Sequence, residues 1–549
     1  MINYKVVIYI LSTLLIGEAI FMLLCAPISV LYGDPDAPAF ILSAGVTFFI
    51  GGLAYLLTRE TNRNMGKREG YIITSVAWVV FSLFGSLPFF VSRAIPSYTD
   101  AFFETMSGFT TTGASILNNI EALSHGLLFW RSLTQWLGGM GIIVMSLAIL
   151  PILGIGGMQL FVAEVPGPMP DKLHPRIKET AKRLWGIYII FTIAEVLLLV
   201  LGKMPLFDAI CHSFATMATG GYSTKQASVA FYASPYLQYV ITLFMFVAGI
   251  NFTLSYFALH RKFGAVFRNE EFKWYTGITL GFTLVIFVGL LLTESIGVEK
   301  AFRDAIFQVV SITTTTGFAT VDYLNWFPLL GVLIFLLMFC WGFGRFYRWR
   351  VKVVRIMVMI KNSWLELKRI IHPNAIIPLR LNSIAVSPQI ISNVMAFISV
   401  YFLVVFISVV IVSAMGYDLE TSFGAVAATL GNIGPGIGQV GPAHNFAHFP
   451  AFGKWFLSFL MLIGRLELFT VLVITDSCLL EKIVLAWAIG QATGQITVSF
   501  SGSIIKREAV LADQITLGFM DFNCLCLLPA RSLSHQHLPR FCATFHGKC

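Results

Sequence analysis

The chain has 549 residues, of which 57% are hydrophobic and only 12% charged, and its mean hydropathy is +0.79. A soluble domain carries about 25% charged residues, so the composition excludes an ordinary soluble globular protein. The net charge of +9 would by itself suggest nucleic acid as a partner, but basic residues cluster in alternate loops between neutral or acidic ones. This asymmetry is the positive-inside signal, so we expect the basic loops and both ends of the core to be cytoplasmic. The basic clusters lie at residues 59–68, 172–183, 261–273 and 352–380.

Apolar runs long enough to cross a bilayer recur along the chain. The first, residues 6–31, is too long for the apolar region of a typical signal peptide, and no small-residue cleavage site follows before Tyr32, so we expect it to remain as a helix. A second run follows at residues 40–57. Four units come next, each predicted to contain a helix, a half-membrane re-entrant segment and a second helix, which makes about ten spanning helices in an all-α polytopic membrane protein. The outer helices are predicted at residues 71–91 and 127–152, 184–201 and 237–257, 275–292 and 327–339, and 390–415 and 452–473.

One pattern occurs four times along the chain. It consists of a residue suited to cap a helix, an apolar stretch, and a short Thr/Gly loop whose glycine follows the cap by thirteen positions. The copies are roughly a hundred residues apart, far too long for a solenoid repeat, so the units are interpreted as duplicated domains. The copies run from Asp100 to Gly113, Asp208 to Gly221, Asp304 to Gly317 and Thr421 to Gly434.

Each re-entrant segment is about a dozen residues long, too short to cross the bilayer. Its first residue is a predicted N-cap, because Asp and Thr side chains accept hydrogen bonds from first-turn amides. Its C-terminus then carries the negative end of the helix dipole, and four such ends near the bilayer centre would favour a cation. Irregular backbone at that depth is tolerated only where it is buried in protein or lines a water-filled cavity. The predicted caps are Asp100, Asp208, Asp304 and Thr421.

The four loops consist mainly of small residues and contain no carboxylate. Small residues let backbone carbonyl oxygens replace the water shell of a dehydrated cation, and a divalent-selective pore usually shows an acidic ring, so a monovalent cation is favoured. The alternative is that small residues only let helices pack closely, but packing requires no common offset from a cap. The predicted filter residues are Thr110, Thr111, Thr112, Gly113, Thr219, Gly220, Gly221, Thr315, Thr316, Gly317, Asn432, Ile433 and Gly434.

Three features carry a family resemblance: the four loops, the two extra N-terminal helices, and the stretch Gly464-RLELFT-Val471. On these features the chain resembles the Trk/Ktr/HKT superfamily of potassium transporters, and within it the bacterial TrkH type. The resemblance covers roughly residues 1–473. The resemblance implies four pseudo-symmetric helix–pore loop–helix repeats around a central pore that passes potassium through one filter. It also implies a homodimer gated by a TrkA-type cytosolic subunit, which binds nucleotide. In this superfamily, glycine at the key filter position of all four repeats is associated with potassium and serine in the first repeat with sodium. The glycines of this chain therefore imply potassium.

Arg465 lies within the last apolar stretch. A charge there costs about 2.5–3.5 kcal/mol to insert and is by default a functional hypothesis. By the resemblance, Arg465 would project towards the permeation path below the filter and tune ion occupancy by repulsion. The alternative is a structural ion pair with Glu467 or Asp476, since side chains near a helix end commonly reach towards the interface. The sequence leaves both interpretations open.

Two stretches depart from the family pattern. After Phe339 the family has a glycine-rich intramembrane loop, of the form GGCAGSTGGGIKVVR, that gates the path below the filter; here Trp341-GFGRFYRWR-Val351 takes its place. Arginines in a cation pathway would each cost several kcal/mol and repel potassium. A reading-frame slip over residues 340–351 explains the change, because codons for residues 341–350 read one base later can encode GALAGSTGGG.

The C-terminal tail departs in the same way. Residues 474–482, ITDSCLLEK, read one base later can encode LLTPAFWRK followed by a stop, which matches the usual end of the family. Residues 474–549 are therefore interpreted as out-of-frame sequence without an evolved function. Six of the eight cysteines lie in the two suspect stretches, and Cys25 and Cys211 lie in apolar contexts, so neither a disulfide framework nor a redox site is predicted.

The sequence thus predicts the pore-forming subunit of a potassium uptake system in a bacterial inner membrane, with potassium at the filter as its only metal. No catalytic group, covalent cofactor or nucleic acid partner is predicted, and membrane lipid surrounds the chain. A cation-coupled secondary transporter is ranked lower, because the repeats run parallel and their loops offer almost only backbone. A non-conducting product is the second alternative, because of the altered gate loop. The predicted domains are 1–68 (two N-terminal helices), 69–160, 161–270, 271–362 and 363–473 (repeats 1 to 4), and 474–549 (the tail).

Overall fold

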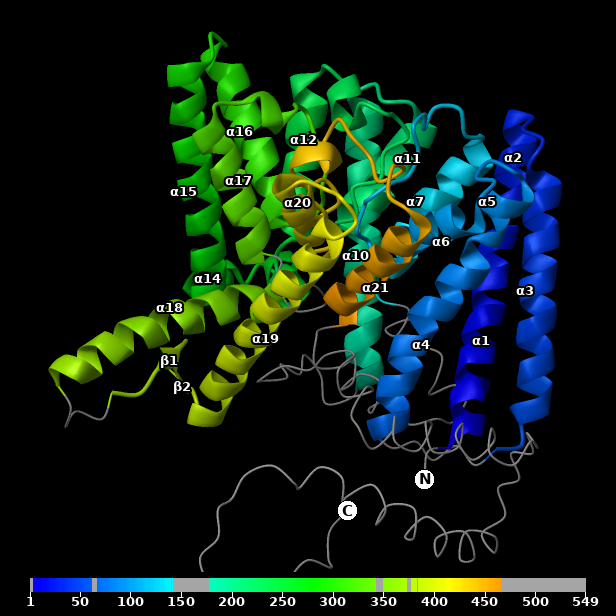
Figure 1. Cartoon of the computed structure of the whole chain (residues 1–549), viewed down its shortest axis with the longest axis horizontal. Helices are drawn as coiled ribbons and strands as arrows, with labels where there is room; N and C mark the ends of the chain where they lie inside the picture. Colours follow the sequence, from blue (N-terminus) through cyan, green and yellow to red (C-terminus); the bar gives the residue numbers. More distant parts are fainter. Residues whose placement is uncertain are drawn as a thin grey trace, which may run out of the picture. The chain divides into compact units, whose positions relative to one another are not determined.

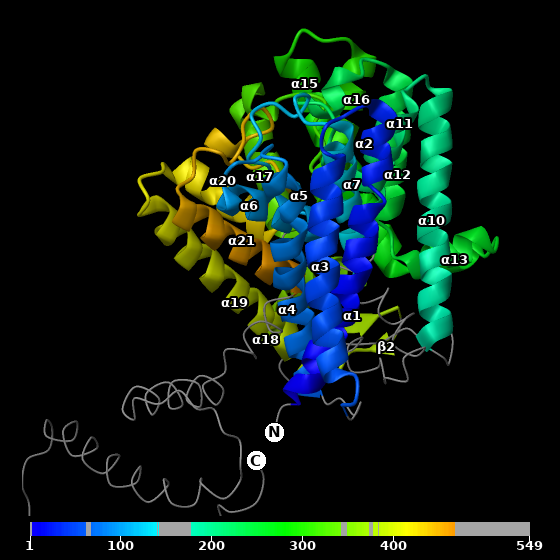
Figure 2. The ribbon, with the colours of Figure 1, turned by 90° about the vertical axis from the view of Figure 1, so that its right-hand side faces the viewer.

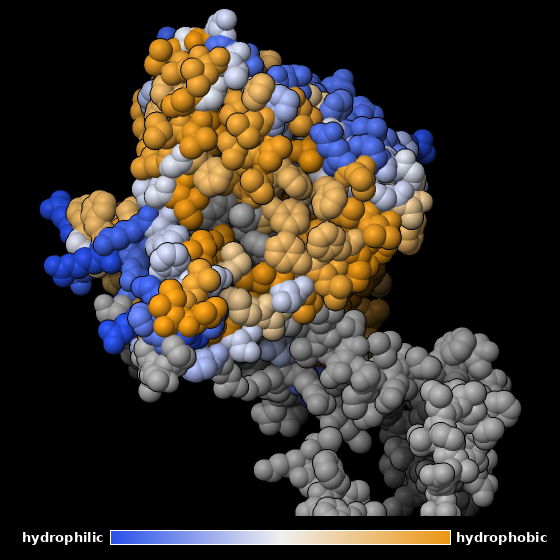
Figure 3. Space-filling view, turned by 60° about the vertical axis from the view of Figure 1, so that its left-hand side comes forward, coloured by the Kyte–Doolittle hydropathy of each residue, from blue (hydrophilic) through white to orange (hydrophobic). Residues whose placement is uncertain are grey.

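The computed structural model describes most of the first 466 residues, in the stretches 3–61, 67–139, 141, 177–341, 349–372, 377–382 and 384–466. Of the first predicted frame slip, at residues 340–351, residues 342–348 lie outside the described residues, and the second, from residue 474 onward, lies wholly outside them, as do Glu467 and Asp476. Within the described stretches, six helices are long and apolar enough to cross a membrane and two shorter apolar helices accompany them, fewer than the ten expected. One face of this part is apolar over most of its middle, with hydrophilic side chains towards its margins (Figure 3).

The N-terminal segment forms three helices. These are α1 (Tyr4–Leu23), α2 (Ala26–Tyr32) and α3 (Ala37–Thr58). The sequence predicted one helix over residues 6–31, but a turn separates α1 from α2. Pro27 lies in the first turn of α2, where a backbone N–H has no acceptor within the helix. Proline, which lacks this N–H, is therefore well suited to the start of the helix. Helix α1 packs against α3 and α4, and the three run side by side in Figure 2.

Repeat 1 places a short pore helix between two outer helices, as predicted. The first outer helix is divided into α4 and α5 at Ser86, and Pro88 lies in the first turn of α5. The elements are α4 (Lys67–Gly85), α5 (Leu87–Val91), the pore helix α6 (Tyr98–Phe109) and α7 (His125–Gly139).

Repeat 2 has the same order, but its second outer helix is broken. The predicted continuous helix over residues 237–257 is wrong, because the chain leaves the helix after Ala248 and resumes at Phe252. A Cβ atom on Gly249 would lie 2.6 Å from the Tyr275 hydroxyl, so a residue with a side chain does not fit here. The elements are α10 (Ile177–Leu201), the pore helix α11 (Leu206–Met217), η1 (Ser228–Phe231), α12 (Pro235–Ala248), α13 (Phe252–Leu259) and α14 (Phe263–Arg268).

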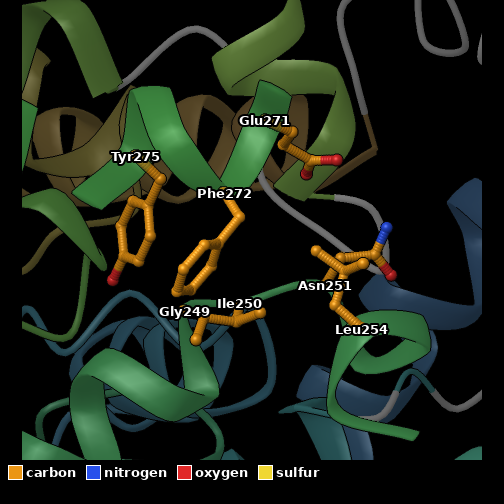
Figure 4. Close-up of a pocket in the computed structure, with 7 residues that line it drawn as sticks. All are labelled: Gly249, Ile250, Asn251, Leu254, Glu271, Phe272 and Tyr275. Carbon is orange, nitrogen blue, oxygen red and sulfur yellow. The ribbon is translucent and has the colours of Figure 1, made fainter. Parts of the chain in front are cut away.

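A small pocket lies at this break. Figure 4 shows Phe272 and Tyr275 extending from the next outer helix towards Gly249 and Ile250, with Asn251 at the other side. The Tyr275 ring stacks on Phe246 with centroids 4.8 Å apart, and its hydroxyl donates to the Phe246 carbonyl (3.3 Å). These contacts hold the broken helix against repeat 3.

Repeat 3 follows the predicted order of outer helix, pore helix and outer helix. The first outer helix begins where the Asn269 side chain accepts the N–H groups of Glu271 (2.9 Å) and Phe272 (3.4 Å), the usual role of an N-cap. The elements are α15 (Glu270–Thr293), the pore helix α16 (Val298–Thr313), η2 (Tyr323–Asn325), α17 (Pro328–Trp341) and the following α18 (Trp349–Ile371).

Repeat 4 follows a two-stranded antiparallel hairpin, the only sheet in the described residues. Arg380 pairs with Ala385 and Leu381 with Ile384 in this hairpin. The elements are β1 (Arg380–Leu381), β2 (Ile384–Ala385), α19 (Pro388–Ser413), the pore helix α20 (Leu419–Leu430), η3 (Gly438–Val440) and α21 (Ala451–Leu466).

The four repeats close into a ring. Each pore helix packs against the outer helices of its own repeat and against the second outer helix of the repeat before it: α6 on α21, α11 on α7, α16 on α12 and α20 on α17. Figure 1 shows α21 beside both α20 and α6, so the last repeat meets the first. The predicted arrangement of four pseudo-symmetric repeats is therefore confirmed, and the ring brings the C-terminal ends of the pore helices to the four Thr/Gly loops.

Candidate ion filter

Each pore helix ends in the same backbone turn. In repeat 1, the N–H of Thr111 donates to the Gly108 carbonyl (2.9 Å) and the N–H of Thr112 to the Ser107 carbonyl (2.8 Å), which is a Schellman motif. The residue after the helix cap adopts a left-handed conformation in every repeat, although none of the four is glycine. These residues are Thr111 (φ 51°), Thr219 (φ 51°), Thr315 (φ 54°) and Asn432 (φ 48°).

Two residues after each left-handed residue comes the predicted filter glycine. The φ angles of Gly113, Gly221, Gly317 and Gly434 are 84°, 78°, 84° and 102°, a region that other residues rarely adopt. Space is restricted as well. A Cβ atom on any of these glycines would approach a backbone carbonyl oxygen of the next loop to under 3.0 Å. The glycines are therefore required both by conformation and by the neighbouring backbone.

These close approaches form a closed cycle. Gly113 lies against the carbonyl of Gly220, Gly221 against that of Thr316, Gly317 against that of Ile433, and Gly434 against that of Thr112. In each case the oxygen belongs to the residue just before the filter glycine of the next loop. The structure thus brings the four predicted loops together, in order, around one centre. Backbone carbonyls grouped in this way offer a cation partial negative charges without a titratable group.

Hydroxyl groups stabilise the loops from within. Thr110 Oγ1 lies 2.8 Å from Thr112 Oγ1, and Thr314 Oγ1 lies 2.7 Å from Thr316 Oγ1. All four side chains are fully buried. Each of these hydroxyls has its hydrogen-bond partner inside its own loop. The buried polar groups of the loop are therefore hydrogen-bonded without partners from elsewhere.

A buried ion pair lies behind the first two loops. Glu104 of α6 and Arg131 of α7 are 2.7 Å apart, with side chains 0% and 3% exposed. Glu104 also accepts the N–H of Ile116 (2.9 Å), and Arg131 donates to the Ser223 carbonyl (2.9 Å). The Arg131 guanidinium stacks 3.5 Å over the Tyr222 ring. The pair therefore ties the segment after the first filter loop to the segment after the second.

The predicted N-cap role is wrong for Asp100 and Thr421. Ser97 caps α6 and accepts the N–H of Asp100 (3.4 Å), and Asp418 caps α20 and accepts the N–H of Thr421 (3.0 Å). Each predicted cap is the third residue of its helix, because a stronger or equal capping residue stands three positions earlier. The Asp100 carboxylate instead pairs with Lys454 (2.6 Å).

The same correction applies to Asp208 and Asp304. Asp208 is the third residue of α11, and its carboxylate accepts the hydroxyls of Thr224 (2.7 Å) and Tyr232 (2.8 Å). Asp304 lies in the second turn of α16, whose cap position is Gly297. Three of the four predicted caps thus lie in a first helical turn, and two of them, Asp100 and Asp208, are acidic side chains that still interact favourably with the helix dipole without capping it.

Arg465 lies against the first filter loop. Its guanidinium donates to Thr111 Oγ1 (3.1 Å) and to the Gly138 carbonyl, and it lies 4.6 Å from the centre of the Trp78 ring. The side chain is 3% exposed. The alternative partners Glu467 and Asp476 are outside the described residues. The resemblance implied that Arg465 projects towards the permeation path, and in the structure its guanidinium contacts a threonine of the first filter loop.

The position of Arg465 has counterparts in other repeats. A Cβ atom on Gly139 would meet Ala218, and one on Gly249 would lie 2.9 Å from Thr314 Cγ2, so each of these glycines faces the loop of the next repeat. Arg465 faces the loop of repeat 1 in the same way. Repeat 4 thus places a buried, positively charged arginine side chain at a position where repeats 1 and 2 have glycine.

Sequence reasoning missed several residues that support the loops. Gln135 of α7 is fully buried and donates from Nε2 to the Gly220 carbonyl (2.7 Å), while its Oε1 accepts the N–H of Tyr222 (3.0 Å). The available signal was polarity: Arg131 and Gln135 are strongly polar residues one turn apart in an otherwise apolar helix. Glu104 gives the same signal within α6.

The fold and these loops define the class of the protein: a multi-pass membrane protein of four pseudo-symmetric repeats around a ring of backbone carbonyls. The chain belongs to the TrkH family of cation transport proteins, whose sequence model matches residues 37–481.

Solved and curated relatives agree with this assignment. The chain is 41% identical over 478 residues to the Trk system potassium uptake protein TrkH of Salmonella typhimurium, covering 86% of this chain and 98% of that protein, and 40% identical to its counterpart in Escherichia coli K12. The crystal structure of the potassium transporter TrkH from Vibrio parahaemolyticus is similar with a TM-score of 0.76 at 36% identity, covering 87% of this chain and all of that one.

Proposed function

We propose that the protein takes up potassium through the ring of the four filter loops. The observation that carries the proposal is the closed cycle of glycines and carbonyls, which brings four backbone segments from separate repeats to one centre. Carbonyl oxygens replace the water shell of a dehydrated ion, and a site built from neutral backbone suits a monovalent cation. The names of the relatives, which are potassium uptake proteins, support potassium as that ion.

Transport through such a filter needs no chemical step. An inside-negative membrane potential supplies about 2.3 kcal/mol per elementary charge per 100 mV, so uptake is channel-like and driven by the potential. The membrane is a bacterial inner membrane, with the basic loops and both ends of the core in the cytoplasm. Two chains form a homodimer, and a TrkA-type nucleotide-binding subunit docks on the basic loops and controls the pore.

The test is uptake of rubidium, a potassium analogue, by the full-length chain reconstituted in liposomes. An imposed inside-negative potential is expected to drive rubidium uptake that excess external potassium suppresses and excess sodium does not. A matched chain with Gly317 replaced by alanine serves as the inactive control, because it keeps every other residue of the ring. Equal uptake by both chains would contradict the proposal.

We also propose that residues 340–351 and 474–549 are out of frame. The family match ends at residue 481, and the relatives are aligned over 98% of their own length while 86% of this chain is covered, which supports a tail without counterpart beyond residue 481. Sequencing the gene across the codons for residues 339–352 and 473–484 tests this directly. A glycine-rich loop and an early stop are expected.

A non-conducting product is the second candidate, because three arginines occupy the stretch that replaces the gate loop. The two candidates differ in one comparison. If the chain as written fails to take up rubidium while a chain with the frame restored does so, the filter is functional and the altered stretch blocks it. If neither takes up rubidium, the proposed filter itself fails.

A further inference from the structure

We infer that Gln135 is a specificity-determining residue of the filter, acting as a positioning residue through the carbonyl of Gly220. Gln135 belongs to α7 of repeat 1, but its amide contacts the loop of repeat 2. Its Nε2 donates to the Gly220 carbonyl at 2.7 Å, and its Oε1 accepts the N–H of Tyr222 at 3.0 Å. The side chain therefore spans Gly221 and fixes the backbone on both sides of that filter glycine.

The two hydrogen bonds also fix which way the amide points. The backbone N–H of Tyr222 is a donor and can bond only to the amide oxygen, so the amide nitrogen faces the Gly220 oxygen. Gln135 is fully buried, so its amide is not exposed at the protein surface. The arrangement is self-consistent, because a flipped amide would place donor against donor and acceptor against acceptor.

The bonded carbonyl is a member of the ring. The Gly220 oxygen is the one that approaches Gly113 of the neighbouring loop. Among the residues that the structure describes, a side chain donates to this ring carbonyl and to none of the other three, those of Thr112, Thr316 and Ile433. The ring is therefore asymmetric. The Gly220 oxygen accepts a hydrogen bond from Gln135, so part of its lone-pair density is already engaged when an ion binds.

Equivalent positions of repeats 2 and 4 carry methionine. Gln135 lies four residues before Gly139, and the residues four positions before Gly249 and Arg465 are Met245 and Met461. Both methionines are fully buried. A thioether has no hydrogen to donate, so these positions cannot hold a carbonyl as Gln135 does. Of the three positions compared in the described residues, only that of repeat 1 carries a hydrogen-bond donor.

A fixed carbonyl affects ion choice rather than folding alone. A ring whose oxygens are free to move inward can coordinate the smaller sodium ion, whereas a held oxygen keeps its distance from the ion. Removing Gln135 is therefore expected to raise sodium permeability relative to rubidium. The net value of one hydrogen bond, about 0.5–1.5 kcal/mol, corresponds to a change of about two- to tenfold in that ratio.

The inference rests on the proposed function, and the experiment separates the two. Sodium and rubidium uptake are measured with full-length chain in liposomes, each normalised to folded protein recovered by size-exclusion chromatography. The variants are Gln135→Met, which installs the residue found at the equivalent positions of repeats 2 and 4, and Gln135→Leu, which removes both the donor to Gly220 and the acceptor for Tyr222 without adding a titratable group. Met245→Leu is the matched control for a buried change at the equivalent level.

The expected result is a sodium-to-rubidium ratio about two- to tenfold above the unmodified chain for both Gln135 variants, with Met245→Leu unchanged. A purely structural role would lower both fluxes together and leave the ratio unchanged, and that outcome would overturn the inference. Gln135→Leu keeps the test valid if Gln135→Met is not recovered in folded form, and an unchanged ratio for it is equally contradictory. Absence of flux in both the unmodified chain and the chain with the frame restored would instead refute the proposed function.

Discussion

The Asn432 side chain donates a hydrogen bond to Thr112 Oγ1 at 2.7 Å, joining two residues 320 positions apart. Asn432 belongs to the fourth filter loop and Thr112 to the first, so this bond closes the ring where the first and last repeats meet. The same amide nitrogen donates to the Met461 carbonyl at 3.0 Å. Asn432 takes the place of the left-handed threonines of the other three loops, and its longer side chain is what reaches across the junction.

Replacing Asn432 by threonine, the residue of the other loops, is expected to remove both bonds while keeping a residue type that these loops tolerate. We expect a loss of about 1–3 kcal/mol in stability, because the buried acceptors on Thr112 and Met461 lose their donor. Thermal denaturation of the detergent-solubilised protein measures the change. A smaller effect is expected for Thr112→Ser, which keeps the hydroxyl acceptor, and equal losses in the two variants would contradict this account.

The contributions of Glu104 and Arg131 to the stability of the fold are predicted to depend on each other, so that losing one charge costs more than losing both. Both side chains are almost completely buried, so Arg131→Met leaves Glu104 as an uncompensated charge, which typically costs about 3–5 kcal/mol. The expected result is loss of most folded protein, measured as the monodisperse fraction in size-exclusion chromatography.

The double variant Glu104→Gln with Arg131→Met is the informative control, because it removes both charges and leaves a neutral acceptor near Ile116. It is expected to recover a large part of the folded fraction lost in Arg131→Met. If the double variant is as poor as the sum of both single changes, the charges contribute independently and the interpretation as a coupled pair fails.

The sequence was sufficient to predict the ring of repeats and the residues of its loops. The common offset between an apolar segment and a glycine can be recognised from the local sequence alone. The positive φ of Gly113 and its counterparts is likewise a local requirement, because it belongs to the loop itself. The helix starts were less accurate, because Asp100 and Ser97 are both good capping residues and the spacing alone does not choose between them.

The support around the loops was not predictable in the same way. Gln135 and Gly220 are 85 positions apart, and only the packing of α11 on α7 brings them together. A polar residue in an apolar helix signals that a partner exists, but not which one. The break after Ala248 was missed because residues 237–257 are mostly apolar, although Gly249 and Asn251 mark the place where the helix is interrupted.

The filter glycines are predicted to tolerate no side chain. A Cβ atom on Gly317 would overlap the Ile433 carbonyl of the next loop and also lie 2.8 Å from Pro435, and its φ of 84° is unfavourable for other residues. Gly317→Ala is therefore expected to reduce rubidium uptake by at least about tenfold, which corresponds to a barrier only about 1.4 kcal/mol higher.

Gly277→Ala in α15 is the matched control for this change, because no atom lies within 4 Å of the added methyl group. Alanine within a helix is favoured over glycine by up to about 1 kcal/mol, so this variant is expected to keep full uptake and gain slight stability. Similar uptake losses in both variants would show that the effect is not specific to the ring.

Arg465 is predicted to limit ion flux through its charge. It is buried and in contact with the first filter loop, and the interaction of a fixed positive charge with a cation is strong where water is excluded. Arg465→Gln keeps a hydrogen-bond donor towards Thr111 but removes the charge, and it is expected to raise rubidium uptake about three- to tenfold, equivalent to about 0.7–1.4 kcal/mol.

Arg465→Lys separates the charge from the geometry of the guanidinium. Lysine keeps the charge but cannot donate to Thr111 Oγ1 and the Gly138 carbonyl with the same planar group. If charge limits flux, the lysine variant stays close to the unmodified chain and only the glutamine variant conducts faster. If Arg465 instead holds the first loop in place, both variants lose uptake and melt at lower temperature, and the proposed electrostatic role is wrong.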